Sequence, residues 1–227
     1  MNNFNMKYYA EILHKAEFSG YKFVTLSEFV DLGFPSQNHF IIRHDIDKSP
    51  ESLNVIIDVE RNMNAKSTCF VRVAGSDYNP IGYKSFNAIS NALKIGCEIG
   101  LHTGFIEFAK INSLNPEDVL SSELKLLRTF FQIDGIAPHR DINYLHNSLP
   151  EIDERWEEFS KTYKLKYHAY DKKILESTTY VNEGFNPHLC WRTLSPYDAI
   201  NDPNKKSIYM LTHPHWWYKI HPFETTQ

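Results

Sequence analysis

Residues 39–47, His-Phe-Ile-Ile-Arg-His-Asp-Ile-Asp, decide the fold, because an apolar β-branched run ends abruptly in ionisable side chains. Side chains alternate between the two faces of a strand, so Asp45 and Asp47 point to the same side. Two carboxylates in that arrangement repel each other unless a cation lies beside them. Alternatively, Asp47 caps a helix that begins near Ser49, since Asp is a good N-cap and Pro50 suits the first turn.

Strands and helices alternate on both sides of this stretch. We expect strands at about 21–26, 40–44, 67–73, 97–101, 135–138, 166–170 and 207–211. We expect helices at about 6–17, 49–63, 85–95, 116–131 and 150–163, and one more that starts at Ser27. This alternation is typical of parallel βαβ units. The pattern predicts an α/β fold, a distorted (β/α) barrel of about seven strands, in a single domain over residues 1–227.

Composition narrows the class of protein. The chain has 227 residues, 42% hydrophobic and 23% charged, which suits a soluble protein with a sizeable core. A net charge of -4 without a Lys/Arg cluster argues against a nucleic-acid partner. We find no signal peptide and no apolar run long enough to cross a bilayer, so we expect a cytoplasmic protein without membrane insertion. Cys69, Cys97 and Cys190 lack a CxxC spacing and are expected to be reduced core residues.

Four of the expected strands end in reactive residues. These ends are Arg-His-Asp-Ile-Asp (43–47), Glu-Ile-Gly-Leu-His-Thr (98–103), Pro-His-Arg-Asp (138–141) and Leu-Thr-His-Pro-His-Trp-Trp (211–217). Because parallel strands end at the same edge of a sheet, these residues should gather on one face, where barrel enzymes have their active sites. Because reactive residues stand at the ends of four strands, we predict that they form one functional site.

The four segments resemble the motifs of the polysaccharide deacetylase family (NodB homology, carbohydrate esterase family 4), whose fold is a distorted (β/α) barrel. The resemblance covers about residues 38–217. It is closer to a subgroup with RHDxD, EIGLH, HR and THPxWW motifs that is linked to surface-polysaccharide (O-antigen-type) biosynthesis. The resemblance implies that Asp45 is the catalytic base and that Asp47 and His102 bind a metal. It also implies that Arg140 holds the base, with Tyr144 near the usual aromatic residue.

One position departs from the family pattern. The family usually has a second histidine four residues after the first, and this chain has Ile106 there. A catalytic metal site normally has three protein ligands, so we look for another histidine at a strand tip. His139 is the leading candidate, although strand alternation would turn it away from Arg140 unless the strand bulges. His213 and His215 are the alternatives.

Aspartate and histidine ligands suit Zn²⁺ or a similar divalent metal. Such a metal would activate water and polarise an amide carbonyl, while Asp45 takes a proton and His213 protonates the leaving amine. Arg140 would pair with Asp45. We predict a metal-dependent hydrolase that removes an N-acetyl group from a sugar precursor of a surface polysaccharide. The substrate would be nucleotide-linked, lipid-linked or an oligosaccharide.

The sequence leaves alternatives open. One is an enzyme that hydrolyses another C–N bond, as in allantoinase-like relatives of the fold. Another is a catalytically silent relative that binds carbohydrate, since Ile106 removes an expected ligand. Arg43 and Arg140 also fit a salt bridge at the barrel rim. Trp216 and Trp217 fit a filled core as well as a sugar-stacking wall.

Overall fold

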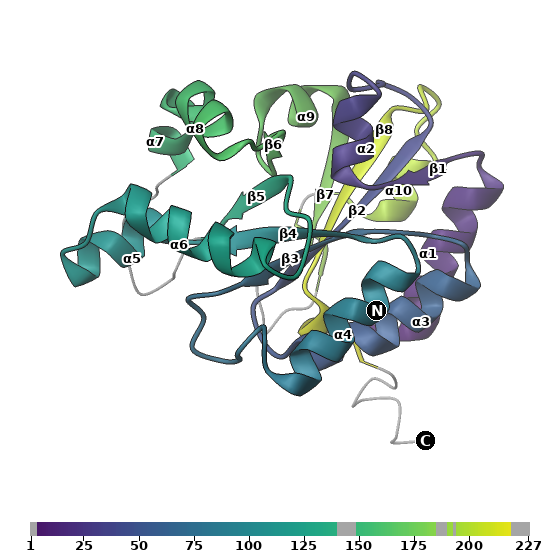
Figure 1. The fold of residues 1–227 in the computed structure, drawn as a ribbon. Coiled ribbons are helices and arrows are strands. Elements are labelled where there is room, and N and C mark those ends of the chain that lie inside the picture. Colours follow the sequence, from purple (N-terminus) through teal and green to yellow (C-terminus); the bar gives the residue numbers. More distant parts are fainter. Residues whose placement is uncertain (1–3, 140–148, 185–189, 193, 219–227) are drawn as a thin grey trace.

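The computed structural model describes residues 4–139, 149–184, 190–192 and 194–218 (Figure 1). Its strands are β1 Lys22–Val24, β2 His39–Ile46, β3 Thr68–Arg72, β4 Glu98–Thr103, β5 Gly135–Pro138, β6 Tyr167–His168, β7 Thr178–Asn182 and β8 Ser207–Thr212. They form one eight-stranded sheet in the order β6-β5-β4-β3-β2-β8-β7, with β1 paired to the start of β2. Every pair is parallel, so all the strands end at one edge, which we call the carboxyl edge.

Helices surround the curled sheet (Figure 1). They are α1 Met6–Phe18, α2 Leu26–Asp31, α3 Leu53–Asn62, α4 Tyr83–Lys94, α5 Phe105–Asn112, α6 Pro116–Arg128, α7 Leu149–Glu154, α8 Trp156–Tyr163, α9 Lys172–Ser177 and α10 Pro196–Ile200, with single 3-10 turns at Pro50–Ser52 and Pro214–Trp216. Among the described residues the edge strands β6 and β7 do not pair with each other, so the barrel is open. The predicted distorted (β/α) barrel is confirmed. No described helix has the length and hydropathy that a membrane span requires.

Several elements differ from the sequence prediction. The prediction missed β7, α5, α9 and α10, and the helix expected at 150–163 is two helices, α7 and α8. Asp47 does not cap the following turn, because the Ser49 side chain accepts the hydrogen bond from the backbone N–H of Glu51. The expectation that all three cysteines lie in the core is wrong for Cys190, which is exposed, whereas Cys69 and Cys97 are buried.

Strand β2 is buried on both faces of the sheet, and alternation separates its side chains into two groups. Phe40 and Ile42 belong to the apolar cluster that includes residues of α1 and α3 outside the sheet. Ile41 belongs to the cluster inside the barrel, with Phe70 and Tyr209. This two-sided burial explains why the strand reads as a nearly continuous apolar run.

Gly100, in the middle of β4, leaves room for a ring inside the barrel. A Cβ atom at this position would lie 2.4 Å from Cε1 of Phe70, closer than packed carbon atoms approach. The Phe70 ring lies 5.3 Å from the guanidinium carbon of Arg43. Gly100 therefore leaves the space that the Phe70 ring occupies, and Arg43 packs against that ring.

His44 points to the outer face, away from its neighbour Asp45, and anchors a buried polar network. Its Nε2 lies 2.7 Å from Oε1 of Glu60, and its Nδ1 lies 2.6 Å from Oγ1 of Thr212. The same carboxylate accepts hydrogen bonds from the hydroxyls of Tyr9 (2.6 Å) and Ser67 (2.9 Å). All five side chains are buried. The network therefore ties the end of β2 to β8, α1 and α3.

The two ends of the described chain are joined beside this network. The backbone N–H of Met6 donates to the carbonyl of Tyr218, and the N–H of Tyr218 donates to the carbonyl of Phe4, both at 2.9 Å. The Phe4 ring lies 4.8 Å from Trp217 and 5.2 Å from Trp191. Trp217 is 6% exposed and fills this core, so for Trp217 the core-filling interpretation is right.

Glu60→Gln should lower the free energy of unfolding by about 3 to 5 kcal/mol, because it removes the charged partner of a buried pair. Burial raises the pKa of Glu60, but His44 and the hydrogen bonds from Tyr9 and Ser67 outweigh it and leave the pKa below its ordinary value. Stability gained from such a carboxyl is complete above its unfolded pKa and is lost as the pH falls through the folded pKa.

Urea unfolding at a series of pH values measures both effects. The wild type should lose stability as the pH falls below about 4.5, and the Glu60→Gln profile should be flatter there. Asp58→Asn, at a largely exposed position of α3, is the matched control and should change stability by less than about 0.5 kcal/mol. Equal stability of Glu60→Gln and the control would contradict the role of the network.

Candidate active site

The four strand ends that the sequence singled out meet in one cleft at the carboxyl edge. The cleft has a volume of about 630 Å³, and its lining includes Asp45, Asp47, His102, His139 and His213. Asp45 lies on β2 and Asp47 just after it, while His102 is on β4. His139 and His213 follow β5 and β8 directly. The parallel topology thus gathers side chains that are up to 168 positions apart in the sequence.

Asp47, His102 and His139 converge on one point. A ligand atom of each lies within 4.8 Å of those of the other two. In the described parts of the chain, these three side chains come close enough together to hold a metal ion. Nε2 of His102 lies 3.1 Å from Oδ1 of Asp47, and Nε2 of His139 lies 3.6 Å from the same oxygen.

Hydrogen bonding determines which nitrogen of His102 faces Asp47. Nδ1 of His102 lies 2.8 Å from the carbonyl oxygen of Ala137, which can only accept, so Nδ1 carries the proton. In the neutral ring Nε2 is then an acceptor that faces Oδ1 of Asp47, a buried atom without a hydrogen-bond partner in the described parts of the chain. Two acceptors at this distance repel each other unless a proton or a metal cation lies between them. The residues therefore fit a divalent metal.

His139 supplies the third donor. Its backbone N–H donates to the carbonyl of Thr103 at 2.8 Å, which fixes the chain just beyond β5. Because His139 lies beyond the end of β5, this hydrogen bond, and not the alternation of side chains along the strand, sets the position of His139. Burial, together with nearby His102 and Arg72, lowers the pKa of His139 to about 4, so the ring is neutral and able to bind a metal at neutral pH. Ile106, at the position of the missing histidine, is buried in the apolar core.

Arg43 holds the carboxylate of Asp45 from inside the barrel. Its Nε and Nη2 donate to Oδ1 and Oδ2 of Asp45, each at 2.7 Å. Burial raises the pKa of Asp45, but Arg43 outweighs it and leaves the pKa below its ordinary value, so the carboxylate is ionised. Arg140 and Tyr144, which the resemblance assigns to this region, lie outside the described residues. Since Arg43 is two positions before Asp45, strand alternation could have predicted this pair.

His213 is oriented by Glu183, which the sequence analysis missed. Nδ1 of His213 lies 2.8 Å from Oε2 of Glu183, and its backbone N–H donates to the same oxygen at 2.7 Å. Nε2 lies 3.6 Å from Oδ2 of Asp47. Burial lowers the pKa of His213, but the Glu183 carboxylate outweighs it and raises the pKa above its ordinary value. Trp217 donates to the second oxygen of Glu183.

The remaining predicted residues take different positions. Trp216 lines the cleft, with its ring 4.2 Å from the His213 ring, unlike the core residue Trp217. His215 is absent from the converging group of metal-binding side chains. Tyr170 and Tyr180 also line the cleft, and neither was singled out in the sequence.

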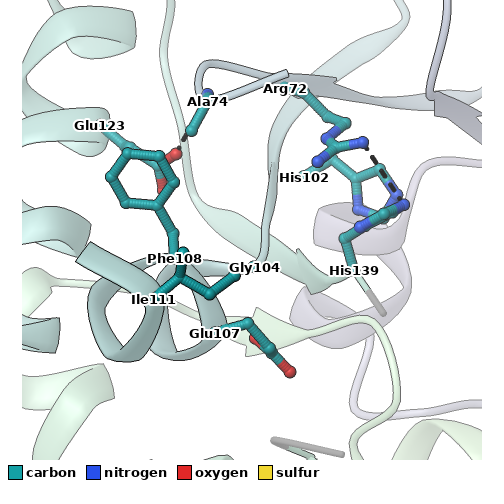
Figure 2. A pocket seen from close by; sticks show the side chains of 9 residues that line it. All are labelled: Arg72, Ala74, His102, Gly104, Glu107, Phe108, Ile111, Glu123 and His139. Carbon is teal, nitrogen blue, oxygen red and sulfur yellow. Dashed lines mark hydrogen bonds between the residues drawn. The ribbon is translucent and has the colours of Figure 1, made fainter. Parts of the chain in front are cut away.

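A small cavity of about 70 Å³ lies beside His102 and His139 (Figure 2). Glu107 lines it, and both of its buried carboxylate oxygens lack a hydrogen-bond partner among the described residues. Arg72 lines this cavity as well as the larger cleft. Nothing in the sequence pattern singled out Arg72, because it ends a strand whose other residues are uncharged.

Fold and site together define a distorted (β/α) barrel with a candidate divalent metal centre at the carboxyl edge. No family model and no curated protein matches the sequence. Among solved structures, the Streptococcus pyogenes deacetylase PplD in complex with acetate is similar, with a TM-score of 0.47 and 13% sequence identity. The alignment covers 96% of this chain and 85% of that chain.

Single alanine variants test the metal centre. His102→Ala and His139→Ala should each weaken Zn²⁺ binding by more than about 100-fold, because losing a ligand costs more than losing an outer contact. His213→Ala and His215→Ala should still bind about one ion per chain. Titration against a chromophoric chelator gives the affinities, with His14→Ala, on the exposed face of α1, as the control. Full zinc affinity in His139→Ala, with loss in His213→Ala or His215→Ala, would show that a different histidine completes the site.

Proposed function

We propose that this protein is a metal-dependent hydrolase that removes an N-acetyl group from a sugar precursor of a surface polysaccharide. The observation that carries the proposal is the position of two proton-transfer groups beside the candidate metal ligands. Oδ2 of Asp45 lies 3.6 Å from Nε2 of His102, and Nε2 of His213 lies 3.6 Å from Oδ2 of Asp47. Amide hydrolysis needs a base for water and an acid for the amine, and these two residues supply both.

Asp47, His102 and His139 would hold the metal. When bound, a divalent ion such as Zn²⁺ supplies a Lewis acid that acidifies water and polarises a carbonyl. The three side chains contribute one carboxylate and two imidazoles, a donor set typical of catalytic zinc sites with an open position. Nδ1 of His102 donates to the carbonyl of Ala137, which fixes the ring in the orientation that ligation needs.

Asp45 acts as the base. Attack on the acetyl carbon requires water to lose a proton, and an ionised carboxylate in the cleft accepts it. Both oxygens of Asp45 already accept a hydrogen bond from Arg43, but each has a second lone pair. The bidentate contact fixes the carboxylate plane while leaving those lone pairs for the proton. Arg43 thereby supports the base in the way that the resemblance assigns to Arg140.

His213 acts as the acid. The amine cannot leave as an anion, so its nitrogen needs a proton as the C–N bond breaks. Glu183 accepts from Nδ1 of His213, which directs Nε2 toward the cleft and stabilises the cationic ring. A catalytically silent carbohydrate-binding protein has no need for such a base and acid pair, and this disfavours that alternative.

The cleft suits a sugar substrate. Its volume of about 630 Å³ falls in the range of small-molecule sites. Trp216, Tyr170 and Tyr180 give it aromatic surface on which the apolar face of a sugar ring can stack. The experiment therefore includes nucleotide-linked, lipid-linked and oligosaccharide substrates.

Acetate release tests the function directly. The zinc-loaded protein should release acetate from at least one N-acetylated sugar in a panel of nucleotide-linked, lipid-linked and oligosaccharide compounds. Chelation should abolish the activity and added zinc should restore it. Cyclic amides of the allantoin type belong in the same panel, and exclusive turnover of these would support the other C–N hydrolase. Full turnover in metal-free protein would overturn the metal-dependent mechanism of hydrolysis.

Asp45→Asn should keep zinc affinity but lose about 10² or more in kcat, because the amide side chain cannot accept the proton. Steady-state kinetics on the best sugar of the panel measures the loss. Zinc content and the thermal midpoint are determined on the same samples, because the change leaves the buried Arg43 charge uncompensated. Asp58→Asn, on the exposed face of α3, is the matched control and should retain the wild-type kcat. Wild-type turnover in Asp45→Asn would show that another group is the base.

His213→Ala should affect amides more than esters. An amine leaves only when protonated, whereas the phenolate of an activated phenyl acetate leaves without a proton. We expect kcat for the N-acetyl sugar to fall by about 10² or more and kcat for the activated ester to fall far less. His14→Ala serves as the control. Equal losses on the two substrates would contradict the acid role.

A further inference from the structure

Arg43 and Arg72 both bring a guanidinium group to this end of the barrel, but of these two only Arg43 pairs with a carboxylate among the described residues. Arg43 is neutralised by its bidentate contact with Asp45 inside the barrel. Arg72, the last residue of β3, lies opposite His102 in the sheet register and lines the cleft. Among the described residues, no carboxylate forms an ion pair with Arg72, and the contact to its side chain is Nη1 to Nε2 of His139 at 3.5 Å.

The side chain of Arg72 is held in this orientation. Its backbone N–H donates to the hydroxyl of Tyr78 at 2.8 Å, and that hydroxyl donates to the carbonyl of Ile46 at the end of β2. Gly75 packs against the stem, because a Cβ atom there would lie 3.3 Å from Cβ of Arg72. Figure 2 shows the guanidinium directed toward His102 and His139, while Glu107 and Glu123 point elsewhere.

The contact with His139 conflicts with metal binding. Nε2 of His139 can accept a hydrogen bond from Arg72 or bind a metal, but its single lone pair cannot do both. Once a metal occupies Nε2, the half-buried guanidinium beside it lacks an acceptor among the described residues. A planar fork of N–H donors next to an open metal position matches a carboxylate or a developing oxyanion.

We propose that Arg72 donates hydrogen bonds to the acyl oxygen during hydrolysis and to the acetate that is released. This inference rests on the proposed function. Water adds its oxygen to the acetyl carbon and gives a proton to Asp45. The C–N bond then breaks, and the nitrogen leaves with the proton of His213. The acyl oxygen gains negative charge in this sequence, and Arg72 stabilises that charge without exchanging a proton itself.

Acetate binding to the zinc-loaded protein tests the role of Arg72 without requiring turnover. The probe is ¹³C-labelled acetate, followed by NMR titration, with the zinc content of each variant measured first. Arg72→Gln should raise the dissociation constant for acetate by about tenfold or more, since it removes a charged, bidentate donor. Arg72→Lys keeps the charge without the fork and should fall between Arg72→Gln and the wild type. Arg61→Gln, on the exposed face of α3, should match the wild type.

Kinetics on the acetylated sugar gives a second measurement. Losing one oxyanion donor should lower kcat of Arg72→Gln by about 10² to 10³, with KM changed only a few-fold. A purely structural role would instead lower the thermal midpoint and leave acetate affinity and kcat unchanged, which would overturn the inference. Should Arg72→Gln lose its zinc, the same comparison is made with Arg72→Lys.

The outcomes separate this inference from the proposed function. Wild-type protein that binds acetate through Arg72, yet hydrolyses no acetylated sugar, would overturn the proposed function and support the carboxylate site. Wild-type protein that hydrolyses the sugar, with Arg72→Gln equal to it in acetate affinity and kcat, would overturn the inference alone. If the zinc-loaded wild-type protein does not bind acetate, the inference about Arg72 is also overturned.

Discussion

The buried ion pair between Arg43 and Asp45 is the constraint on which the site depends. A guanidinium inside an apolar barrel is costly unless every donor is satisfied. The carboxylate of Asp45 accepts two of its hydrogen bonds, and the hydroxyls of Tyr209 and Tyr170 accept others. Replacing either partner would leave an uncompensated charge in the core. The barrel interior therefore specifies the position of the carboxylate that faces the cleft.

The side chains of β2 alternate between the two faces of the sheet, so this strand contributes to polar contacts on both faces. Arg43 and Asp45 face inward, whereas His44 faces outward and joins Glu60 and Thr212. Thr212 directly precedes His213, so the outer network also fixes the end of β8, from which His213 enters the cleft. Asp45 and His213 are thus held in register by buried hydrogen bonds on the opposite face of the sheet.

The strand ends explain what the sequence could predict and what it could not. The apolar run before Asp45 and the motifs around His102, His139 and His213 predicted both the barrel and the residues that meet in the cleft. β7 escaped prediction because its Thr-Thr-Tyr-Val-Asn sequence is short and partly exposed, without a clear apolar alternation. Glu183, just beyond it, was missed with it. Arg72 was missed because its importance depends on His139, a neighbour in space 67 positions away.

The pairing of residues 4–6 with Tyr218 has a further consequence. Trp217 packs against Phe4 and donates to Glu183, which in turn orients His213. The orientation of His213 therefore depends on residues 4–6, which lie far from it in the sequence. In biosynthesis on the ribosome, the amino-terminal segment must wait for residues 207–218 before it can dock. His213 can therefore reach the orientation described here only after Tyr218 has been synthesised.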